Sequence, residues 1–475
     1  MGKPTGFMEY KRENNLEIKP LERIKNFNEF HVPMSEEERS VQASRCMDCG
    51  VPFCQSGMMI GGMASGCPLN NLIPEWNDMV YRNGYEQALG RLLKTNNFPE
   101  FTSRVCPSPC EAACTCGLND SPVTIKENEN AIIEYGYEHG LMGPKPPKVR
   151  TGKKVAIVGS GPSGLTCAGD LAKAGYDVTV FEALHELGGV LVYGIPEFRL
   201  PKQKVVKKEI EKVKELGVKF ETNVVIGKST TIDQLIEDEG FEAVFIGSGA
   251  GLPMFMGIPG ENASGVFSAN EYLTRSNLMK AFDDSYDTPI AAGKKVAVVG
   301  GGNVAMDAAR TALRLGAEVH IVYRRSEEEL PARVEEVHHA KEEGIVFDLL
   351  TNPTEILVDE NGSVKGMTCI RMELGEPDDS GRRRPVEIAG SEFTLDVDTV
   401  IMSLGTSPNP LISSTTKGLE TNRRKCIVAE EENGQTSKEG VFAGGDAVTG
   451  AATVILAMGA GKAGAKGIDE YLKNK

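Results

Sequence analysis

The sequence predicts an α/β protein with two domains built on parallel sheets, preceded by a small, mainly helical domain. Three observations carry this prediction. A strand, a glycine-rich turn, a helix and a second strand occur twice in the same order, the cysteines concentrate near the N-terminus, and a segment rich in Pro, Gly and Lys (141–152) separates the two regions. A length of 475 residues suits three domains of ordinary size.

The composition narrows the classes of function. Lys and Arg total 52 against 67 Asp and Glu, a net charge of −15, which argues against nucleic acid and against an anionic membrane surface as partners. No uncharged apolar run reaches the length of a membrane span, and the N-terminal stretch lacks the apolar core of a secretory signal. We therefore expect a cytoplasmic protein whose eleven cysteines are reduced rather than joined in disulfides.

The N-terminal region concentrates thiols, since eight of the eleven cysteines lie within residues 46–116. Helices are expected at 35–44 and 77–96. Ser35 followed by Glu38 predicts a capping box at the start of the first helix. These features indicate a separate helical domain with its own chemistry.

The first repeat has a glycine-rich turn between a strand at 153–159 and a helix. Its three glycines allow a tight turn, close approach of a pyrophosphate and close packing of the helix, whose N-terminus supplies N–H donors. The motif residues are Gly159, Ser160, Gly161, Pro162, Ser163 and Gly164. The next strand (176–182) ends in Glu182, where a ribose hydroxyl needs an acceptor. The unit therefore predicts a dinucleotide site.

The second repeat has a strand at 294–300 and then a turn with the residues Gly300, Gly301, Gly302, Asn303, Val304 and Ala305. Its second strand (317–325) ends in Tyr323, Arg324 and Arg325. An acid there would repel a 2′-phosphate, whereas Arg binds one bidentately, so this site is expected to prefer NADPH over NADH. Arg333 is expected to complete the pocket. The alternative interpretation of Arg324 and Arg325 is a solvated basic pair.

The C-terminal stretch 440–465 predicts a strand, a Gly-Gly-Asp turn and a long helix. It resembles the second flavin fingerprint of two-dinucleotide flavoproteins, in which the Asp contacts the ribityl chain and the helix N-terminus faces the flavin. Asp446 is the matching position, and its alternative role as a helix N-cap is compatible with flavin binding. The first repeat is thus expected to bind FAD, with Gly189, Gly445 and Thr453 assigned to the same site.

The order of these motifs predicts that the second nucleotide domain is inserted within the first. The repeat is an internal duplication of one βαβ design. Strands at 241–250 and 398–410 each end in Gly followed by small residues and Pro, as expected where the chain crosses between the domains. We predict two Rossmann-like dinucleotide-binding domains after a helical iron–sulfur domain, with a helical domain over 1–148, an FAD-binding domain over 149–287 and 405–475, and an NADPH-binding domain over 288–404.

The cysteines fall into two groups, Cys46-x2-Cys49-x4-Cys54-x12-Cys67 and Cys106-x3-Cys110-x3-Cys114-x1-Cys116. Clustered thiolates bind zinc or iron–sulfur clusters, and neither spacing is that of common ferredoxins. A flavin reduced by hydride holds two electrons, so a one-electron carrier is its natural acceptor, which favours iron–sulfur clusters over zinc or structural thiols. Cys167 stands alone on the helix after the first turn, so the paired cysteines of a disulfide reductase are not expected.

Several long segments resemble the family of small (β) subunits of NADPH-dependent glutamate synthase. They are MGKPTGFMEYKRE at the start, CPLNNLIPEWNDMVYR (67–82), CPSPCEAAC (106–114), YGIPEFRLPK (193–202) and GGGNVAMDAAR (300–310). The resemblance covers essentially the whole chain. The chain is also similar to the N-terminal part of dihydropyrimidine dehydrogenase and to the larger subunit of NADH-dependent ferredoxin:NADP⁺ oxidoreductase.

The resemblance implies two [4Fe–4S] clusters with crossed ligation. By it, Cys46, Cys49, Cys54 and Cys114 hold one cluster, and Cys67, Cys106 and Cys110 hold the other. The pyrimidine enzyme uses a Gln as the eighth ligand, and Glu129 stands at the matching position. The alternative is sequential ligation with Cys116 as a ligand, whereas the crossed scheme leaves Cys116 as a spare thiol.

The family also implies the reaction. NADPH passes hydride to FAD by positioning alone, without a protein acid or base, and electrons leave singly through the clusters to a large subunit. That hetero-oligomer makes L-glutamate from 2-oxoglutarate and glutamine, and the glutamine chemistry is expected on the other chain. Alternatives are a subunit of the bifurcating NADH-dependent ferredoxin:NADP⁺ oxidoreductase, a free-standing NADPH oxidoreductase with zinc in the cysteine domain, and a non-catalytic assembly subunit.

Overall fold

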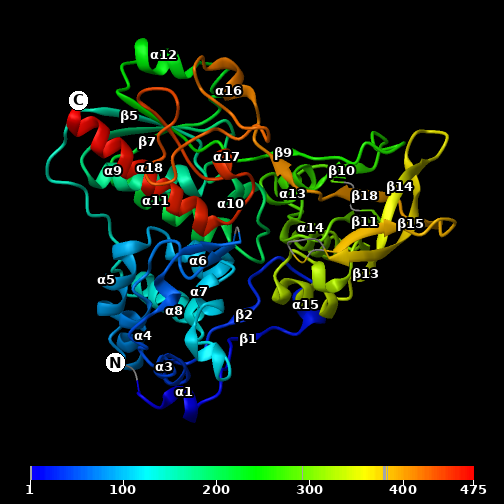
Figure 1. The fold of residues 1–475 in the computed structure, drawn as a ribbon, viewed down its shortest axis with the longest axis horizontal. Helices are drawn as coiled ribbons and strands as arrows, with labels where there is room; N and C mark the ends of the chain where they lie inside the picture. The colour runs from blue at the N-terminus through cyan, green and yellow to red at the C-terminus, as the bar shows by residue number, and fades with distance from the viewer. Residues whose placement is uncertain (1–2, 62, 291–292, 378–380, 382) are drawn as a thin grey trace.

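The computed structural model describes residues 3–61, 63–290, 293–377, 381 and 383–475. An N-terminal helical region lies beside two α/β regions, and the C-terminal helix returns to the boundary between the helical region and the first of them (Figure 1). No described helix is long and apolar enough to cross a membrane.

In its described residues, the N-terminal region consists of short helices, two short strand pairs and two 3-10 turns. Its elements are α1 (Gly6–Glu9), β1 (Leu16–Glu17), α2 (Pro20–Arg23), β2 (His31–Val32), α3 (Glu36–Ser44), the 3-10 turn η1 (Phe53–Gln55), β3 (Met58–Ile60), β4 (Met63–Ser65), α4 (Ile73–Tyr81), α5 (Tyr85–Thr95), α6 (Pro99–Val105), α7 (Pro109–Ala112), η2 (Thr115–Leu118) and α8 (Ile125–Glu138). The capping box of Ser35 and Glu38 is confirmed at the start of α3.

The helix expected at 77–96 is two helices, α4 and α5. The chain turns at Asn83, which takes the left-handed conformation (φ 57°), and at Gly84. Asn is one of the few non-glycine residues that adopt this conformation at low cost. The turn lets α4 and α5 fold against each other around Trp76 and Leu92, both fully buried.

The first α/β region is a parallel sheet of five strands in the order β20-β8-β5-β6-β7. Its elements are β5 (Lys154–Val158), α9 (Pro162–Lys173), β6 (Asp177–Phe181), α10 (Val190–Tyr193), the π-turn η3 (Lys202–Val206), α11 (Lys207–Glu215), β7 (Lys219–Glu221), α12 (Ile232–Glu237), β8 (Ala243–Ile246), α16 (Leu411–Thr415), β20 (Val441–Ala443), α17 (Asp446–Thr449) and α18 (Val454–Asn474). The C-terminal strand β20 pairs with β8, so the end of the chain completes this sheet.

The second α/β region repeats the design with the order β10-β18-β11-β12-β13 and adds an antiparallel sheet of β14 to β17. Its elements are β10 (Val266–Ser268), α13 (Ala269–Asn277), β11 (Lys295–Val299), α14 (Asn303–Arg314), β12 (Glu318–Tyr323), η4 (Glu327–Glu329), α15 (Val334–Glu342), β13 (Val346–Leu349), β14 (Thr351–Val358), β15 (Val364–Pro377), β16 (Arg383–Glu387), β17 (Phe393–Leu395) and β18 (Thr399–Met402). Together the two parallel sheets confirm the predicted fold class.

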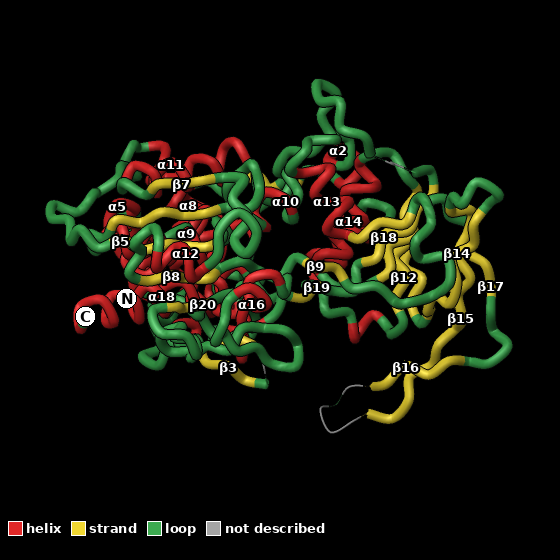
Figure 2. The backbone as a smooth tube through the Cα atoms, turned by 90° about the horizontal axis from the view of Figure 1, so that it is seen from above, coloured by secondary structure: helices red, strands yellow, loops and turns green. Residues whose placement is uncertain are grey.

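Two short strands join the α/β regions. β9 (Leu252–Pro253) leaves the first region and pairs antiparallel with β19 (Thr406–Ser407), which returns to it. Figure 2 shows this pair between the two sheets, with β16 extending at the far edge. Since β10 and α13 belong to the second sheet and its core, we propose that the inserted region runs between β9 and β19, which is longer than the predicted 288–404.

A buried charge network joins all three regions. Glu343, at the end of α15, accepts hydrogen bonds from Arg310 and Arg314 of α14 and from Arg23 of the N-terminal segment, the last at 2.7 Å. These guanidinium groups are almost fully buried, as is the carboxylate. Burial alone would raise the pKa of Glu343, but hydrogen bonds from Arg314 and Arg310 hold it at about 2.

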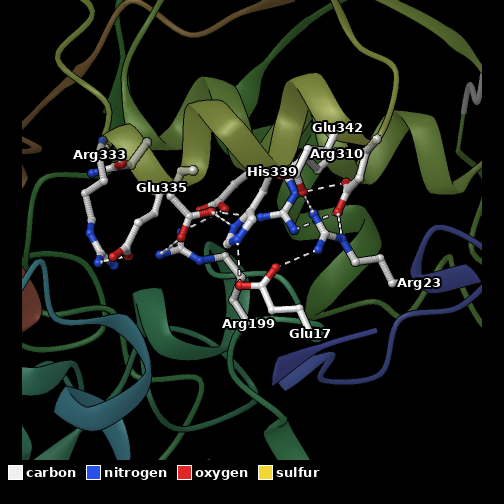
Figure 3. A network of polar contacts seen from close by, with 12 residues as sticks. Glu17, Arg23, Arg199, Arg310, Arg333, Glu335, His339 and Glu342 are labelled. Atoms are coloured by element: carbon white, nitrogen blue, oxygen red, sulfur yellow. Dashed lines mark hydrogen bonds and ion pairs between the residues drawn. The ribbon is translucent and has the colours of Figure 1, made fainter. Parts of the chain in front are cut away.

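The first α/β region enters the same network through Arg199. Its guanidinium donates to Asp307 at 2.8 and 2.9 Å and pairs with Glu336 at 3.1 Å. Figure 3 shows Glu17 and Arg23 approaching the helix that carries His339 from one side. The position of the second α/β region therefore depends on charges supplied by both other regions.

We predict that Glu343→Ala destabilises the second α/β region by about 3–5 kcal/mol, since buried arginines lose their carboxylate. Urea unfolding measures the loss. Glu342→Ala is the matched control: that neighbour is 52% exposed and pairs with Arg23 at 3.3 Å, so its loss should stay below about 1 kcal/mol. Equal effects of the two substitutions would contradict the role given to Glu343.

Candidate functional site

The first glycine-rich turn joins β5 to α9 and has the shape that a dinucleotide phosphate needs. Gly159 has φ +99°, and a Cβ there would lie 2.5 Å from the Gly247 carbonyl oxygen. A Cβ on Gly164 would clash with the Gly159 carbonyl oxygen, whereas the space at Gly161 is open. Pro162 is the first residue of α9, where a missing N–H costs nothing. The open position at Gly161 thus faces the free N-terminus of α9.

Glu182 lies directly beneath this turn. Its carboxylate accepts hydrogen bonds from the Ser160 N–H at 3.0 Å, the Ser160 hydroxyl and the Leu184 N–H at 2.9 Å. A carboxylate has about four lone-pair positions, so one remains for a ribose hydroxyl. Glu182 therefore shapes the turn in addition to the role predicted from the sequence.

Residues from distant parts of the chain close around the same turn. A Cβ on Gly189 (φ +54°) would lie 3.0 Å from Gly161 Cα, and one on Gly445 (φ +69°) would lie 2.8 Å from Ser163 Oγ. Only glycine permits both approaches without strain. The turn, Gly189 and Gly445 together form a narrow cradle of glycine backbone.

Asp446 and Thr453 stand at the starts of two helices, α17 and α18. Asp446 begins α17, and burial raises the pKa of its carboxyl to about 6, although it accepts from the Ala452 N–H at 3.3 Å. Thr453 caps α18 by accepting from the Leu456 N–H. Gly445, directly before Asp446, approaches Ser163, so the start of α17 lies at the first nucleotide turn.

The second turn joins β11 to α14 in the same way. Gly300 has φ +140°, and a Cβ there would clash with the Ser403 carbonyl oxygen, while the space at Gly302 is open. Asn303 accepts a hydrogen bond from the Arg333 N–H at 2.9 Å. Val304 is 46% exposed at the helix start and Ala305 is fully buried, so Ala305 can act on a ligand only through its backbone.

Arg324 and Arg325 directly follow β12 and line a cavity of about 750 Å³. Arg324 is exposed, whereas the Nε atom of Arg325 is buried and has no hydrogen-bond partner in the described structure. An anionic ligand would satisfy that donor. Arg333 is absent from the lining of this cavity, and its guanidinium pairs with Glu335 (Figure 3). Its backbone N–H lies at the second turn through Asn303, so its role in the NADPH site stays a prediction.

The first cysteine set is Cys46, Cys49, Cys54 and Cys114, with Cys116 beside it. Burial raises the pKa of Cys54, and the neighbouring thiols of Cys46, Cys114 and Cys49 raise it further. A hydrogen bond from Cys116 lowers the pKa of Cys114 to about 6, and the Cys116 thiol also lies 3.5 Å from the Arg45 carbonyl. The mutual influence of these thiols shows that they face one another.

The second set lines one pocket and consists of Cys67, Cys106, Cys110 and Glu129. Burial raises the pKa of Cys106 to about 12 and that of Glu129 to about 7. Glu129 accepts hydrogen bonds from Thr102 and from Asn96, the latter at 3.1 Å. Three thiols and a carboxyl group around one pocket fit the four ligand positions of a four-iron cluster.

Cys114 is thus a neighbour of Cys54, and neither Cys114 nor Cys116 lines the pocket of Cys106 and Cys110, a grouping compatible with crossed ligation. In the described part of the chain, no three His, Cys, Asp or Glu side chains are arranged around a single metal ion.

The pocket of the second cysteine set also touches α18, because Ile455 forms part of its wall. Ile455 lies in the first turn of α18, two residues after Thr453. A Cβ on Gly459, one turn further, would come within 3.7 Å of the Pro68 carbonyl oxygen. The same helix, α18, thus lies against the second cysteine pocket at Ile455 and against the first nucleotide turn at Gly461, where a Cβ would clash with the Ser163 carbonyl oxygen.

Known proteins resemble this chain along its whole length. Residues 153–461 match the family model of pyridine nucleotide-disulphide oxidoreductases, and residues 23–141 match that of dihydropyrimidine dehydrogenase domain II with a 4Fe-4S cluster. The small chain of NADPH glutamate synthase from Bacillus subtilis is 41% identical over 99% of both chains. The chain belongs to the glutamate synthase small-chain family.

Other relatives differ in length and in name. The beta subunit of an NADP⁺-dependent formate dehydrogenase from Moorella thermoacetica is 42% identical over 86% of this chain, which spans 59% of that protein. The NADH glutamate synthase of Schizosaccharomyces pombe is 37% identical over 100% of this chain, which spans 23% of it. FprA of Mycobacterium tuberculosis with NADPH shares the fold (TM-score 0.57, 20% identity, 68% of this chain and 85% of that one).

These matches confirm the predicted family, fold class and enzyme class. The chain is an NAD(P)H-dependent flavin oxidoreductase of the glutamate synthase small-chain type, with an FAD/NAD(P)-binding region and a 4Fe-4S cluster region.

Two site residues were not anticipated from the sequence, Arg384 and Asn352, which share the cavity with Arg324 and Arg325. No sequence motif indicated Asn352 as a site residue. Arg384 lies in a conspicuous run of basic residues that follows Gly381, but only the pairing of β16 with β15 brings it to the site.

We predict that Cys116→Ser retains all cluster iron, whereas Cys110→Ser loses about half of it, four of about eight atoms for two four-iron clusters. Iron analysis of anaerobically purified protein measures both. Cys114→Ser, the neighbour of Cys116 on the same loop, is the matched control and should also lose iron. Full iron loss in the Cys116 variant would contradict crossed ligation.

Proposed function

We propose that this chain is the electron-input subunit of an NADPH-dependent glutamate synthase and works in the cytoplasm with a large subunit. The first glycine-rich turn and Asp446 would hold FAD, which would supply a hydride acceptor for NADPH. The two cysteine sets would hold two [4Fe–4S] clusters, which would supply one-electron carriers to a large subunit that forms L-glutamate from 2-oxoglutarate and glutamine. The proposal rests on membership of the small-chain family and on the arrangement of the two sites.

The observation that carries the proposal is the position of α18, which contacts both sites. Its Gly461 packs against Ser163 of the first nucleotide turn and its Ile455 lines the second cysteine pocket, which supports direct electron transfer between the ligands of the two sites. A zinc-binding cysteine domain would have no need of this contact. The Glu129 carboxyl lies in that pocket together with three thiols, which supports its proposed role as the eighth ligand.

The chain's own residues bind and orient the reactants. The open positions at Gly161 and Gly302 receive phosphates at the starts of α9 and α14. Arg324 and Arg325 select NADPH by its 2′-phosphate, while Glu182 holds the first turn and offers its remaining lone pair to a ribose. No described side chain is needed as an acid or base for hydride transfer, since positioning supplies the rate.

A large subunit needs a docking surface near a cysteine set, and residues 50–66 provide one. This segment contains no charged residue, although 25% of the chain is charged. Its exposed side chains are Val51, Phe53, Met58, Met59, Ile60 and Met63, at 48–74% exposure. Exposed apolar patches of this kind mark interaction sites. The segment connects Cys49, which is exposed, to Cys54 and Cys67.

The occupant that we infer for this apolar segment is the large subunit. The Schizosaccharomyces pombe relative, which contains this chain's counterpart as 23% of a longer polypeptide, supports a partner of that kind. A surface without charge favours an apolar counterpart over an acidic or basic one.

We predict that anaerobic titration with NADPH bleaches the flavin absorbance and then produces cluster EPR signals in the holoprotein. Arg324→Ala combined with Arg325→Ala should raise the NADPH concentration required about tenfold or more, because charge-assisted hydrogen bonds to the 2′-phosphate are lost. The NADH requirement should stay unchanged. Flavin that remains oxidised with excess NADPH would overturn the proposal.

We also predict that Met59→Asp combined with Met63→Asp weakens binding of the purified large subunit about tenfold or more, since charge is placed in an apolar contact. Sedimentation measures the affinity, and NADPH-dependent dye reduction should be unchanged. The matched control is Val149→Asp, because Val149 is 77% exposed against 74% for Met63 and lies in the linker. Unimpaired binding by the double variant would refute this docking surface, and binding to a different flavoprotein alone would refute the partner.

A further inference from the structure

Three arginines line the cavity that lies beyond the end of β12. Arg324 and Arg325 lie on one side, directly after the strand, and Arg384 of β16 lies on the other. Glu387 is the one carboxylate among the lining residues, so the cavity carries an excess of positive charge. Like charges gathered in one cavity repel each other unless an anion binds between them.

The arginines inside and outside this cavity differ in whether they form ion pairs with carboxylates. Arg383, next to Arg384 on the same strand, pairs with Glu329 at 2.7 Å and with Glu328 at 3.3 Å. Arg333 pairs with Glu335. Within the described structure, neither Arg384 nor Arg324 forms an ion pair with a carboxylate, including Glu387. The carboxylates of Glu328, Glu329 and Glu335 thus pair with arginines outside the cavity.

Arg325 supplies a second, independent sign of a missing acceptor. Its Nε atom is buried and has no hydrogen-bond partner among the described residues. A buried donor without an acceptor costs about 1–3 kcal/mol, so a ligand with acceptor oxygens is expected there. The side chain that carries this donor belongs to the same cavity lining as Arg384.

The place of the cavity identifies the class of ligand. The glycine-rich turn that leads into α14 follows β11. Arg324 follows β12, which is the parallel neighbour of β11. In such βαβ units, the end of the second strand receives the 2′ position of the adenosine ribose. The ligand group at the arginines is therefore a phosphate monoester on that ribose.

We propose that Arg384 is a third phosphate-binding arginine, which reaches the 2′-phosphate of NADPH from the antiparallel sheet opposite Arg324 and Arg325. The inference rests on the proposed NADPH site and extends it. Arg384 is a specificity-determining residue in this scheme: it distinguishes NADPH from NADH and takes no part in hydride transfer. An exposed arginine with a flexible side chain can close over the phosphate after it binds.

The test uses adenosine 2′,5′-bisphosphate as the probe and 5′-AMP, which lacks the 2′-phosphate, as the comparison ligand. Calorimetry with the holoprotein at low salt should show Arg384→Ala binding the bisphosphate about fivefold more weakly, with 5′-AMP affinity unchanged. Arg384→Lys should recover part of the loss. In steady-state assays the KM for NADPH should rise by a similar factor, while kcat and the KM for NADH stay the same.

Arg383→Ala is the matched control, since it removes an adjacent guanidinium that is paired outside the cavity, and its affinities should equal those of the unmodified protein. If Arg384→Ala binds the bisphosphate normally while Arg324→Ala binds it weakly, the inference on Arg384 is overturned and the NADPH site stands. If Arg324→Ala also binds normally, both assignments are overturned. A circular dichroism spectrum identical to that of the unmodified protein establishes that each variant is folded.

Discussion

The close approach of α18 to both the first nucleotide turn and the second cysteine pocket is the contact on which the rest of the structure depends. A Cβ on Gly461 would clash with the Ser163 carbonyl oxygen, so α18 can lie against α9 only because that position is glycine. Lys462, beside it, pairs with Asp170 of α9 and donates to Asn97 of the helical region. One helix thus fixes the distance between the two sites that electrons have to cross.

The second α/β region is held by a different kind of force. Its contacts with the other two regions include Arg23, Arg199 and Glu343, which are buried ions rather than apolar side chains. Buried ion pairs add little net stability compared with apolar packing, but they tolerate few alternative geometries. This property suits a region whose nucleotide has to meet the first region's ligand in one orientation.

Charge is distributed unevenly over the functional surfaces. The cavity with Arg324, Arg325 and Arg384 is basic in a chain with a net charge of −15, and the segment 50–66 has no charge at all. The basic cavity favours a small phosphorylated ligand, whereas the uncharged segment 50–66 favours contact with a protein surface. The two surfaces lie at opposite ends of the electron path proposed for this chain.

Local chemistry explains why much of the site could be predicted. A phosphate-binding turn consists of consecutive residues, so it can be recognised from the sequence alone. This holds for the glycines from Gly159 to Gly164, for Glu182 and for the pair Arg324 and Arg325. The repeat of the βαβ pattern likewise indicated two parallel sheets. The break at Asn83 and the antiparallel sheet of β14 to β17 were missed, because a single left-handed residue and short edge strands leave weak periodic signals.

The sequence by itself determined the two turns, the reactive thiols and the sign of charge at each nucleotide site, since these depend on neighbours along the chain. Only the tertiary structure decided how the sites meet. It placed Ile455 in the lining of the Cys67 pocket, left Cys116 outside that lining, paired Arg333 with Glu335 and brought Arg384 to the cavity of Arg324. The reason is physical: these contacts join residues far apart in the chain, and packing between whole elements sets their distances.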